Sequence, residues 1–299
     1  MLSLLLPPTL VGLLAGALLI LSVTVAGLLF LPFVVLKLLV PVPAFQRACK
    51  DLMFRIPRQW AAFNRLVYRL MYPVAWEIDV RGTFDPKRSY LLIGNHQSWI
   101  DILLVFDQFT RRTPPLCFFL KRELLWMPVI GWACWAMDFP FMTRTGMAGD
   151  LETTRRFCDR FRDHPVTVVN FAEGTRFSEE KRVSKRSPYR HLLRPKTAGI
   201  AFTLDAMGDQ FAGIIDVTIA YRSSRHAPLW SFLIGEQTDL AITIDVLPVP
   251  TELIGGNYAA DKAFRERFQT WLNGIWERKD ARLERLINRP AAAAKPRTT

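Results

Sequence analysis

The chain opens with a long apolar stretch that no charge interrupts. Residues 2–36 carry no acidic or basic side chain, and the first charge is Lys37. A helix of this length would reach about 50 Å, whereas the hydrocarbon core of a bilayer is about 30 Å thick. The segment must therefore tilt, bend or fold back, and Pro32 is the expected break. Residues 1–40 are predicted to be an uncleaved membrane anchor rather than a signal peptide, because the stretch lacks a basic start and exceeds a signal-peptide core in length.

A segment with a regular mixture of basic and apolar positions follows, over residues 41–75. Its basic residues recur near helical spacing, with large apolar residues between them: Arg47, Lys50, Arg58, Arg65 and Arg69. This pattern predicts a basic amphipathic helix in the headgroup layer of a membrane, broken near Pro57. An ordinary surface helix with an arginine-rich solvent face is the alternative. Since these cations follow the apolar stretch, the rest of the protein is expected to face the cytoplasm.

From residue 76 onward, short apolar runs alternate with amphipathic stretches. Strands are predicted at 77–81, 89–94, 116–120, 138–142, 166–171, 213–221, 230–235 and 240–247. Helices are predicted at 98–109, 123–136, 149–163, 197–207 and 258–288. The alternation predicts an α/β domain over residues 76–288, with a largely parallel, buried central sheet flanked by helices. The tail 289–299 is predicted to be disordered.

The net charge of +12, from 39 basic and 27 acidic residues, narrows the choice of partners. An anionic membrane, a phosphorylated substrate or a nucleic acid would each suit a basic surface. The apolar start favours lipid, and no recognisable fingerprint of nucleic-acid binding accompanies the charge, so no nucleic-acid partner is expected. The four cysteines lack metal-type spacing and there is no H-E-x-x-H block, which predicts reduced cysteines and no metal site.

A histidine and an aspartate stand five positions apart directly after a predicted buried strand, in the stretch Asn-His-Gln-Ser-Trp-Ile-Asp. On one continuous helix the side chains of His96 and Asp101 would point about 140° apart and could not meet. They can touch if His96 lies in the loop after the strand and Asp101 lies in the first turn of the next helix, for which Ser98 is a suitable N-cap. An acid at that position also stabilises a helix start. The pair is therefore either a catalytic dyad or a helix cap.

A second polar block, Glu173-Gly174-Thr175-Arg176, follows the predicted strand at 166–171. In open α/β sheets, ligands bind at the edge formed by the carboxyl ends of the strands. Arginine can grip a phosphate through two parallel hydrogen bonds, and glycine lets the backbone come close to a ligand. Lys121 and Arg144 also follow predicted strands. Several cations are thus expected at the edge that carries the histidine and the aspartate.

Together the two blocks resemble those of the glycerolipid acyltransferases, which carry an H-x4-D block and an EGTR-type block. The similarity covers roughly residues 76–250 and is greatest to the 1-acylglycerol-3-phosphate (lysophosphatidate) acyltransferases. Ala172 stands where this family often has a proline, and Thr143 stands where it often has an aspartate. The segments "DVT" (216–218) and "LLRPKTAG" (192–199) look more like the branch that includes lysocardiolipin acyltransferases.

The resemblance implies a membrane-bound enzyme that transfers a fatty acyl group from acyl-CoA or acyl carrier protein to the free hydroxyl of lysophosphatidate, without a bound cofactor. His96 would be the general base, and Asp101 would orient it. Glu173 would orient Arg176 or bind the glycerol hydroxyl. The residues expected to bind substrate are Glu173, Gly174, Thr175, Arg176, Arg144 and Lys121. The expected location is a bacterial inner membrane, with the catalytic domain in the cytoplasm.

Several alternatives stay open at this point. Lysocardiolipin or lysophosphatidylglycerol is the alternative acceptor, and a protein of another class would bind anionic lipid without catalysis. Residues 181–196 hold seven basic side chains and form either a solvated loop or a loop that attracts anionic lipid, coenzyme A or acyl carrier protein. Trp126, Trp132 and Trp135 are expected in the core, with an acyl tunnel or a membrane contact as the other possibilities.

Overall fold

The structure, a computed structural model, describes residues 1–40, 42–73, 75–142, 147–162, 164–222, 228–237 and 239–289. Its centre is a six-stranded sheet in the order β1-β8-β7-β2-β6-β3. These strands are β1 (Ala75–Arg81), β2 (Ser89–Gly94), β3 (Leu116–Phe118), β6 (Thr167–Phe171), β7 (Phe211–Tyr221) and β8 (Asp239–Leu247). All neighbouring pairs are parallel except β7 and β8. The predicted α/β class with a largely parallel central sheet is confirmed.

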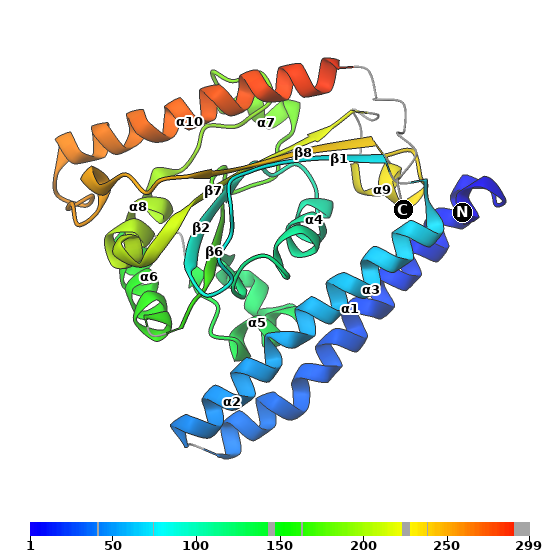
Figure 1. The fold of residues 1–299 in the computed structure, drawn as a ribbon, viewed down its shortest axis with the longest axis horizontal. Helices are drawn as coiled ribbons and strands as arrows, with labels where there is room; N and C mark the ends of the chain where they lie inside the picture. The colour runs from blue at the N-terminus through cyan, green and yellow to red at the C-terminus, as the bar shows by residue number, and fades with distance from the viewer. Residues whose placement is uncertain are drawn as a thin grey trace.

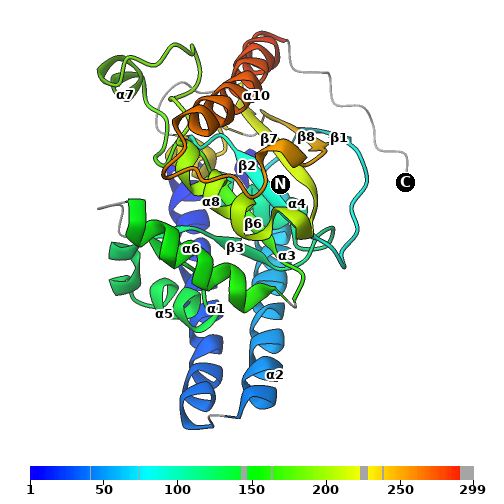
Figure 2. The ribbon, with the colours of Figure 1, turned by 90° about the vertical axis from the view of Figure 1, so that its left-hand side faces the viewer.

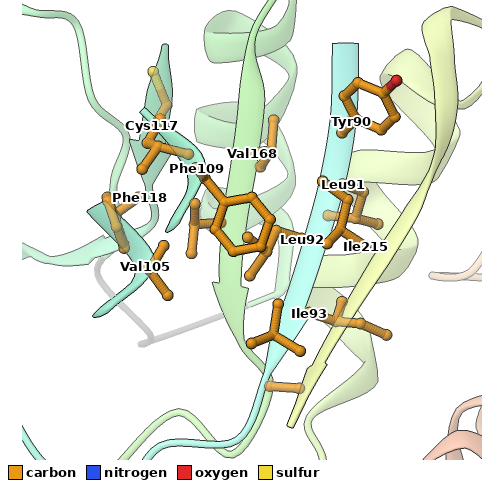
Figure 3. Packing of buried hydrophobic residues seen from close by; sticks show 14 of the residues in the cluster. Tyr90, Leu91, Leu92, Ile93, Val105, Phe109, Cys117, Phe118, Val168 and Ile215 are labelled. Carbon is orange, nitrogen blue, oxygen red and sulfur yellow. The ribbon is translucent and has the colours of Figure 1, made fainter. Parts of the chain in front are cut away.

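The middle of this sheet is buried. Every residue of β2 is buried, and Figure 3 shows Leu91, Leu92 and Ile93 packed beside Val168 of β6 and Ile215 of β7. An unbroken apolar run of this kind is typical of a parallel strand that is covered on both faces. The hydrophobic pattern of the chain therefore determines the centre of the fold.

The helices that flank the sheet begin and end close to most of the predicted ranges. They are α4 (Ile100–Phe109), α5 (Ile130–Ala136), α6 (Met147–Phe161), α7 (Glu179–Ser184), α8 (Thr197–Met207), α9 (Pro228–Leu233) and α10 (Lys262–Asn288). The described residues also contain four short 3-10 turns: η1 (Leu2–Leu4), η2 (Arg122–Trp126), η3 (Gly208–Gln210) and η4 (Thr251–Leu253). Figure 1 shows α10 on one side of the sheet and α4 on the other.

Three of the predicted elements are wrong in part or whole. The apolar run at 230–235 is not a strand, because most of it lies in α9, which packs against the N-terminal helix; so short a run does not distinguish the two structures. The helix predicted at 123–136 is divided into η2 and α5 around Pro128, which lacks a backbone N–H. The strand predicted at 138–142 shrinks to β5 (Phe141–Met142), which pairs with β4 (Leu120–Lys121) in a separate two-stranded sheet.

A helical hairpin precedes the sheet domain. Its first arm is α1 (Pro8–Leu39), and its second arm consists of α2 (Pro43–Met53) and α3 (Arg55–Met71). The predicted break at Pro32 is wrong, because α1 continues through that residue. A proline removes one backbone hydrogen bond, and the other hydrogen bonds of this long helix keep it continuous. The break predicted near Pro57 lies between α2 and α3, which puts this proline in the first turn of α3, where it is tolerated.

The first arm of the hairpin is docked on the α/β domain near both of its ends and at its middle. A Cβ atom on Gly12 would lie 2.6 Å from the side chain of Ile234, and one on Gly27 would lie 1.7 Å from that of Val129. Near the other end, the ammonium group of Lys37 donates to the carbonyl of Ala136 at 2.8 Å. Figures 1 and 2 show α1 and α3 running along one side of the domain, away from α10. Glycine is thus required where α1 touches the domain most closely.

The hairpin side of the molecule exposes large apolar side chains. By length and composition, α1 is the one helix in the described ranges that is long and apolar enough to cross a membrane, although such a helix alone is weak evidence. The core prediction for Trp126, Trp132 and Trp135 is wrong, since they are 81%, 49% and 45% exposed. For Trp132 and Trp135 the reason is that α5 buries its small residues instead: Gly131, Ala133, Cys134 and Ala136.

Candidate active site

The register between β2 and β6 brings the two polar blocks together. Gly94 at the end of β2 is paired with Phe171 at the end of β6, so the loops that follow leave the sheet side by side. The buried amide of Asn95 then ties the first loop to β7, because it donates to the carbonyl of Ile219 and accepts from its N–H, both at 2.9 Å. His96 is therefore the first residue of the loop that is free to face outward.

His96 and Asp101 are in direct contact. The distance from His96 Nδ1 to Asp101 Oδ2 is 2.8 Å, with the aspartate side chain fully buried and 15% of the histidine side chain exposed. The ring of His96 also stacks on Phe171, with centroids 4.3 Å apart. Since a carboxylate accepts, Nδ1 carries the proton, and Nε2 of the neutral ring is left as a base.

The same carboxylate also organises the start of α4. Asp101 Oδ2 accepts from the backbone N–H of Gln97 at 2.6 Å and of Ser98 at 2.8 Å. Ser98 is the predicted N-cap, but Trp99 occupies that position in the structure. The helix therefore begins one residue later than predicted. The two interpretations of the spacing are thus compatible: Asp101 caps the loop and also contacts the histidine.

Tyr221 completes this cluster and was not among the predicted site residues. Its hydroxyl donates to Asp101 Oδ1, and burial raises its pKa well above the usual value, which keeps the hydroxyl protonated. Tyr221 ends β7, which is parallel to β2. A tyrosine at the end of a buried parallel strand was the available signal, but only the register shows which residue it reaches.

Glu173 is hydrogen-bonded to the backbone of the loop that contains His96, and so holds this loop in place. Its side chain is 1% exposed; Oε1 accepts from the backbone N–H of His96 at 3.0 Å, and Oε2 accepts from that of Leu193 at 2.8 Å. Burial raises its pKa to about 8. Within the described part of the chain, its hydrogen-bond partners are these two amides and not Arg176. The geometry therefore assigns Glu173 a bracing role, which differs from the predicted contact with Arg176 or ligand.

The remainder of the second block forms a tight turn beside the histidine. Gly174 has φ +65°, a conformation that favours glycine. The hydroxyl of Thr175 accepts from the ammonium group of Lys181 at 3.2 Å, and the same group donates to the carbonyl of Arg176 at 2.9 Å. The next residue, Phe177, donates from its N–H to the carbonyl of His96 at 2.7 Å. The two blocks are thus joined backbone to backbone.

Arg176 is exposed, and its guanidinium carbon lies 5.2 Å from the ring centroid of Trp99, the residue that caps α4. Its charge is therefore presented to solvent next to the histidine loop, as a ligand for an anionic group would be. Lys121 is also exposed, but it lies on β4 in the second sheet, and no contact within the described ranges joins it to His96. Arg144 lies outside the described residues.

Residues 77–222 match the family model described as Acyltransferase. These residues belong to the Acyltransferase family. The match contains His96, Asp101 and the Glu173–Arg176 block, so the cluster just described lies within the matched part of the chain.

The chain is similar to several named proteins. It is 30% identical to 1-acyl-sn-glycerol-3-phosphate acyltransferase 3 of Arabidopsis thaliana, over 48% of this chain and 41% of that protein. It is 28% identical to 1-acyl-sn-glycerol-3-phosphate acyltransferase gamma of Mus musculus, over 65% and 52%. It is also 26% identical to lysocardiolipin acyltransferase 1 of Danio rerio, over 88% and 68%. The chain spans about half the length of the first two relatives.

The acyltransferase fold also has a solved counterpart. The crystal structure of the 1-acyl-sn-glycerophosphate (LPA) acyltransferase PlsC from Thermotoga maritima aligns with a TM-score of 0.50 over 91% of this chain and 97% of that one. At 14% sequence identity, this likeness shows the fold alone. It extends beyond the family match and includes helices on either side of it.

Proposed function

We propose that this chain is a membrane-associated acyltransferase that moves a fatty acyl group from an acyl thioester to the free hydroxyl of lysophosphatidate. One observation carries the proposal: the 2.8 Å contact between His96 Nδ1 and Asp101 Oδ2 at the carboxyl edge of a parallel sheet. The family match and the relatives named 1-acyl-sn-glycerol-3-phosphate acyltransferases support the choice of reaction. The thioester is a co-substrate, and the reaction as written uses no resident cofactor.

The proposed chemistry needs a base at His96 Nε2, because a lipid hydroxyl is too weakly acidic to attack a thioester unaided at neutral pH. Nε2 takes the hydroxyl proton as the oxygen bonds to the thioester carbonyl carbon. The tetrahedral intermediate then collapses, the carbon–sulfur bond breaks, and the imidazolium returns the proton to the departing thiolate. Asp101 stabilises the imidazolium between these steps, and no covalent acyl-enzyme forms.

Arg176 is the proposed clamp for the acceptor phosphate. Its exposure, its place over Trp99 and the backbone contact between Phe177 and His96 support this role. A planar guanidinium can hold two phosphate oxygens at once, which would fix the distance from the phosphate to the reacting hydroxyl. Thr175, Gly174 and Lys121 remain proposed substrate-binding residues with weaker support, since none of them shows a free charge beside the histidine.

The acyl donor is proposed to be acyl-CoA or acyl carrier protein. Exposed cations gather in the loop that follows α7: Lys185, Arg186, Arg190 and Arg194. Figures 1 and 2 place α7 beside α10 and away from the hairpin. That position favours an anionic thioester carrier over the membrane surface as the partner of these cations.

The hairpin is proposed to lie in one leaflet of the membrane rather than to cross it. Contacts of Gly12 and Gly27 with the domain, and of Lys37 with Ala136, hold α1 against the α/β domain along its length. A helix tethered in this way cannot pass alone through a bilayer, whereas its exposed leucines and the exposed tryptophans of α5 suit the interface. Attachment to the cytoplasmic face of a bacterial inner membrane is also proposed, and the basic residues that follow α1 support the cytoplasmic side.

An acyl-transfer assay on purified full-length protein in phospholipid vesicles tests the function. Lysophosphatidate, lysocardiolipin and lysophosphatidylglycerol are offered one at a time with acyl-CoA or acyl carrier protein, and thiol release and lipid product are measured together. Product formed most rapidly from lysophosphatidate is the expected result. Lipid binding without thiol release from either donor would support the non-enzymatic alternative.

A larger acceptor is the second candidate, favoured by one observation. The relative named lysocardiolipin acyltransferase 1 aligns over 88% of this chain, compared with 48% and 65% for the two relatives named as acting on 1-acyl-sn-glycerol-3-phosphate. The chemistry at His96 would be the same for either acceptor. In the assay above, a preference for lysocardiolipin would select this candidate.

A further inference from the structure

The C-terminal helix α10 lies outside the residues that match the acyltransferase family, yet it reaches the backbone of the proposed catalytic histidine. Trp276 is fully buried in α10, and its indole N–H donates to the carbonyl of Leu193 at 3.1 Å. The N–H of Leu193 donates to Glu173 at 2.8 Å, and Glu173 accepts from the N–H of His96 at 3.0 Å. An unbroken series of hydrogen bonds thus runs from α10 to His96.

One turn further along α10, a second buried side chain contacts strand β7, which lies on the other side of the histidine loop. Lys279 is fully buried, and its ammonium group donates to the Asp216 carboxylate and, at 2.6 Å, to the carbonyl of Val217. Both partners belong to β7, the strand whose Ile219 is held by the amide of Asn95. The histidine loop is therefore held by Glu173 on one side and by β7 on the other. Helix α10 is hydrogen-bonded to Leu193, the partner of Glu173, and to β7.

We infer that Trp276 is a positioning residue for the reaction, acting on His96 through Leu193 and Glu173; this inference rests on the proposed function. Both carboxylate oxygens of Glu173 are engaged, and its side chain is buried, so it stays in place only while the backbone at Leu193 stays in place. The hydrogen bond from the indole N–H of Trp276 holds the Leu193 carbonyl in place. Loss of that bond leaves a buried carbonyl without its partner and frees the segment that braces the histidine.

The test is Trp276→Phe in the full-length chain, which removes the N–H and keeps an aromatic ring in the core. The amide N–H groups of His96 and Leu193 should exchange with deuterium at least about tenfold faster under native conditions. In the acyl-transfer assay, kcat should fall about tenfold while the KM values for acceptor and donor stay within about twofold, because the base is displaced and the binding groups are not.

Leu283→Ala is the matched control. Leu283 is fully buried in the same helix, seven residues further on, and its loss weakens the packing of α10 without touching Leu193. The inference is overturned if Leu283→Ala lowers kcat as much as Trp276→Phe does, or if Trp276→Phe leaves the exchange of both amides unchanged. If the parent protein transfers no acyl group, the proposed function fails, and the exchange measurement still decides whether α10 holds the loop.

Discussion

The candidate site and the N-terminal hairpin depart from the usual distribution of polar and apolar residues in opposite directions. At the site, Asp101 is fully buried and Glu173 is 1% exposed, and hydrogen bonds engage both oxygens of each. On the hairpin side, Leu13 is 65% exposed and Trp126 is 81% exposed. The first departure is stable because the buried groups are hydrogen-bonded. The second is expected only where lipid replaces water, so the contrast separates the proposed chemistry from the proposed membrane contact.

The largest expected effect is on the chemical side of this contrast. His96→Ala should lower kcat by about 10²–10⁴, since it removes a general base. The change should leave the fold intact, because the backbone N–H that Glu173 binds is retained. Steady-state acyl-transfer kinetics measure the first effect, and circular dichroism with vesicle flotation measures the second. A variant that keeps more than about half of the parent kcat would show that His96 is not the base.

Arg176→Ala sharpens the comparison between chemistry and binding. Loss of a charge-assisted phosphate contact should raise the KM for lysophosphatidate about tenfold, with a smaller change in the KM for the acyl donor. Arg267→Ala is the control, because Arg267 is also exposed but lies on α10, outside the cations that are proposed to bind substrate. Equal rises in both KM values in the Arg176 variant would contradict the clamp.

The membrane side is tested by replacing the three exposed tryptophans of η2 and α5 with alanine together. Each such side chain transferred into the interface contributes free energy of about 1 kcal/mol or more, so partition into anionic vesicles should weaken at least about tenfold. The protein should stay folded, because these side chains are exposed. Val183→Ala serves as the control: this residue is 62% exposed on α7, away from the hairpin. Unchanged vesicle binding by the triple variant would remove α5 from the membrane contact.

The last effect concerns the dependence of stability on pH. Burial raises the pKa of Glu173 from 4.5 to about 8, so the folded chain holds this proton more tightly than the unfolded chain does. Its contribution to the free energy of unfolding is therefore full below pH 4.5 and is lost as the pH rises towards 8, by up to about 1.4 kcal/mol per pH unit.

Denaturant unfolding of the parent and of Glu173→Gln across this pH range measures the effect. The stability of the parent should fall relative to that of Glu173→Gln as the pH rises, because glutamine does not titrate. Glu252→Gln, at an exposed carboxylate, should follow the parent at every pH. Parallel pH profiles for the parent and Glu173→Gln would show that this carboxyl group titrates normally.

The amino-acid sequence by itself determined the α/β class and the parallel centre of the sheet, and it allowed a contact between His96 and Asp101. These follow from local patterns: an apolar run long enough for a buried strand, and a spacing that lets two side chains meet only across a loop and a helix start. The tertiary structure alone decided that Tyr221 shares the aspartate, that Glu173 braces the histidine loop instead of facing a ligand, and that α10 supports both. It also placed the tryptophans of α5 on the surface and made 230–235 largely helical. Each of these depends on which distant segments pack together, and hydrophobic periodicity describes the faces of an element without naming its neighbour.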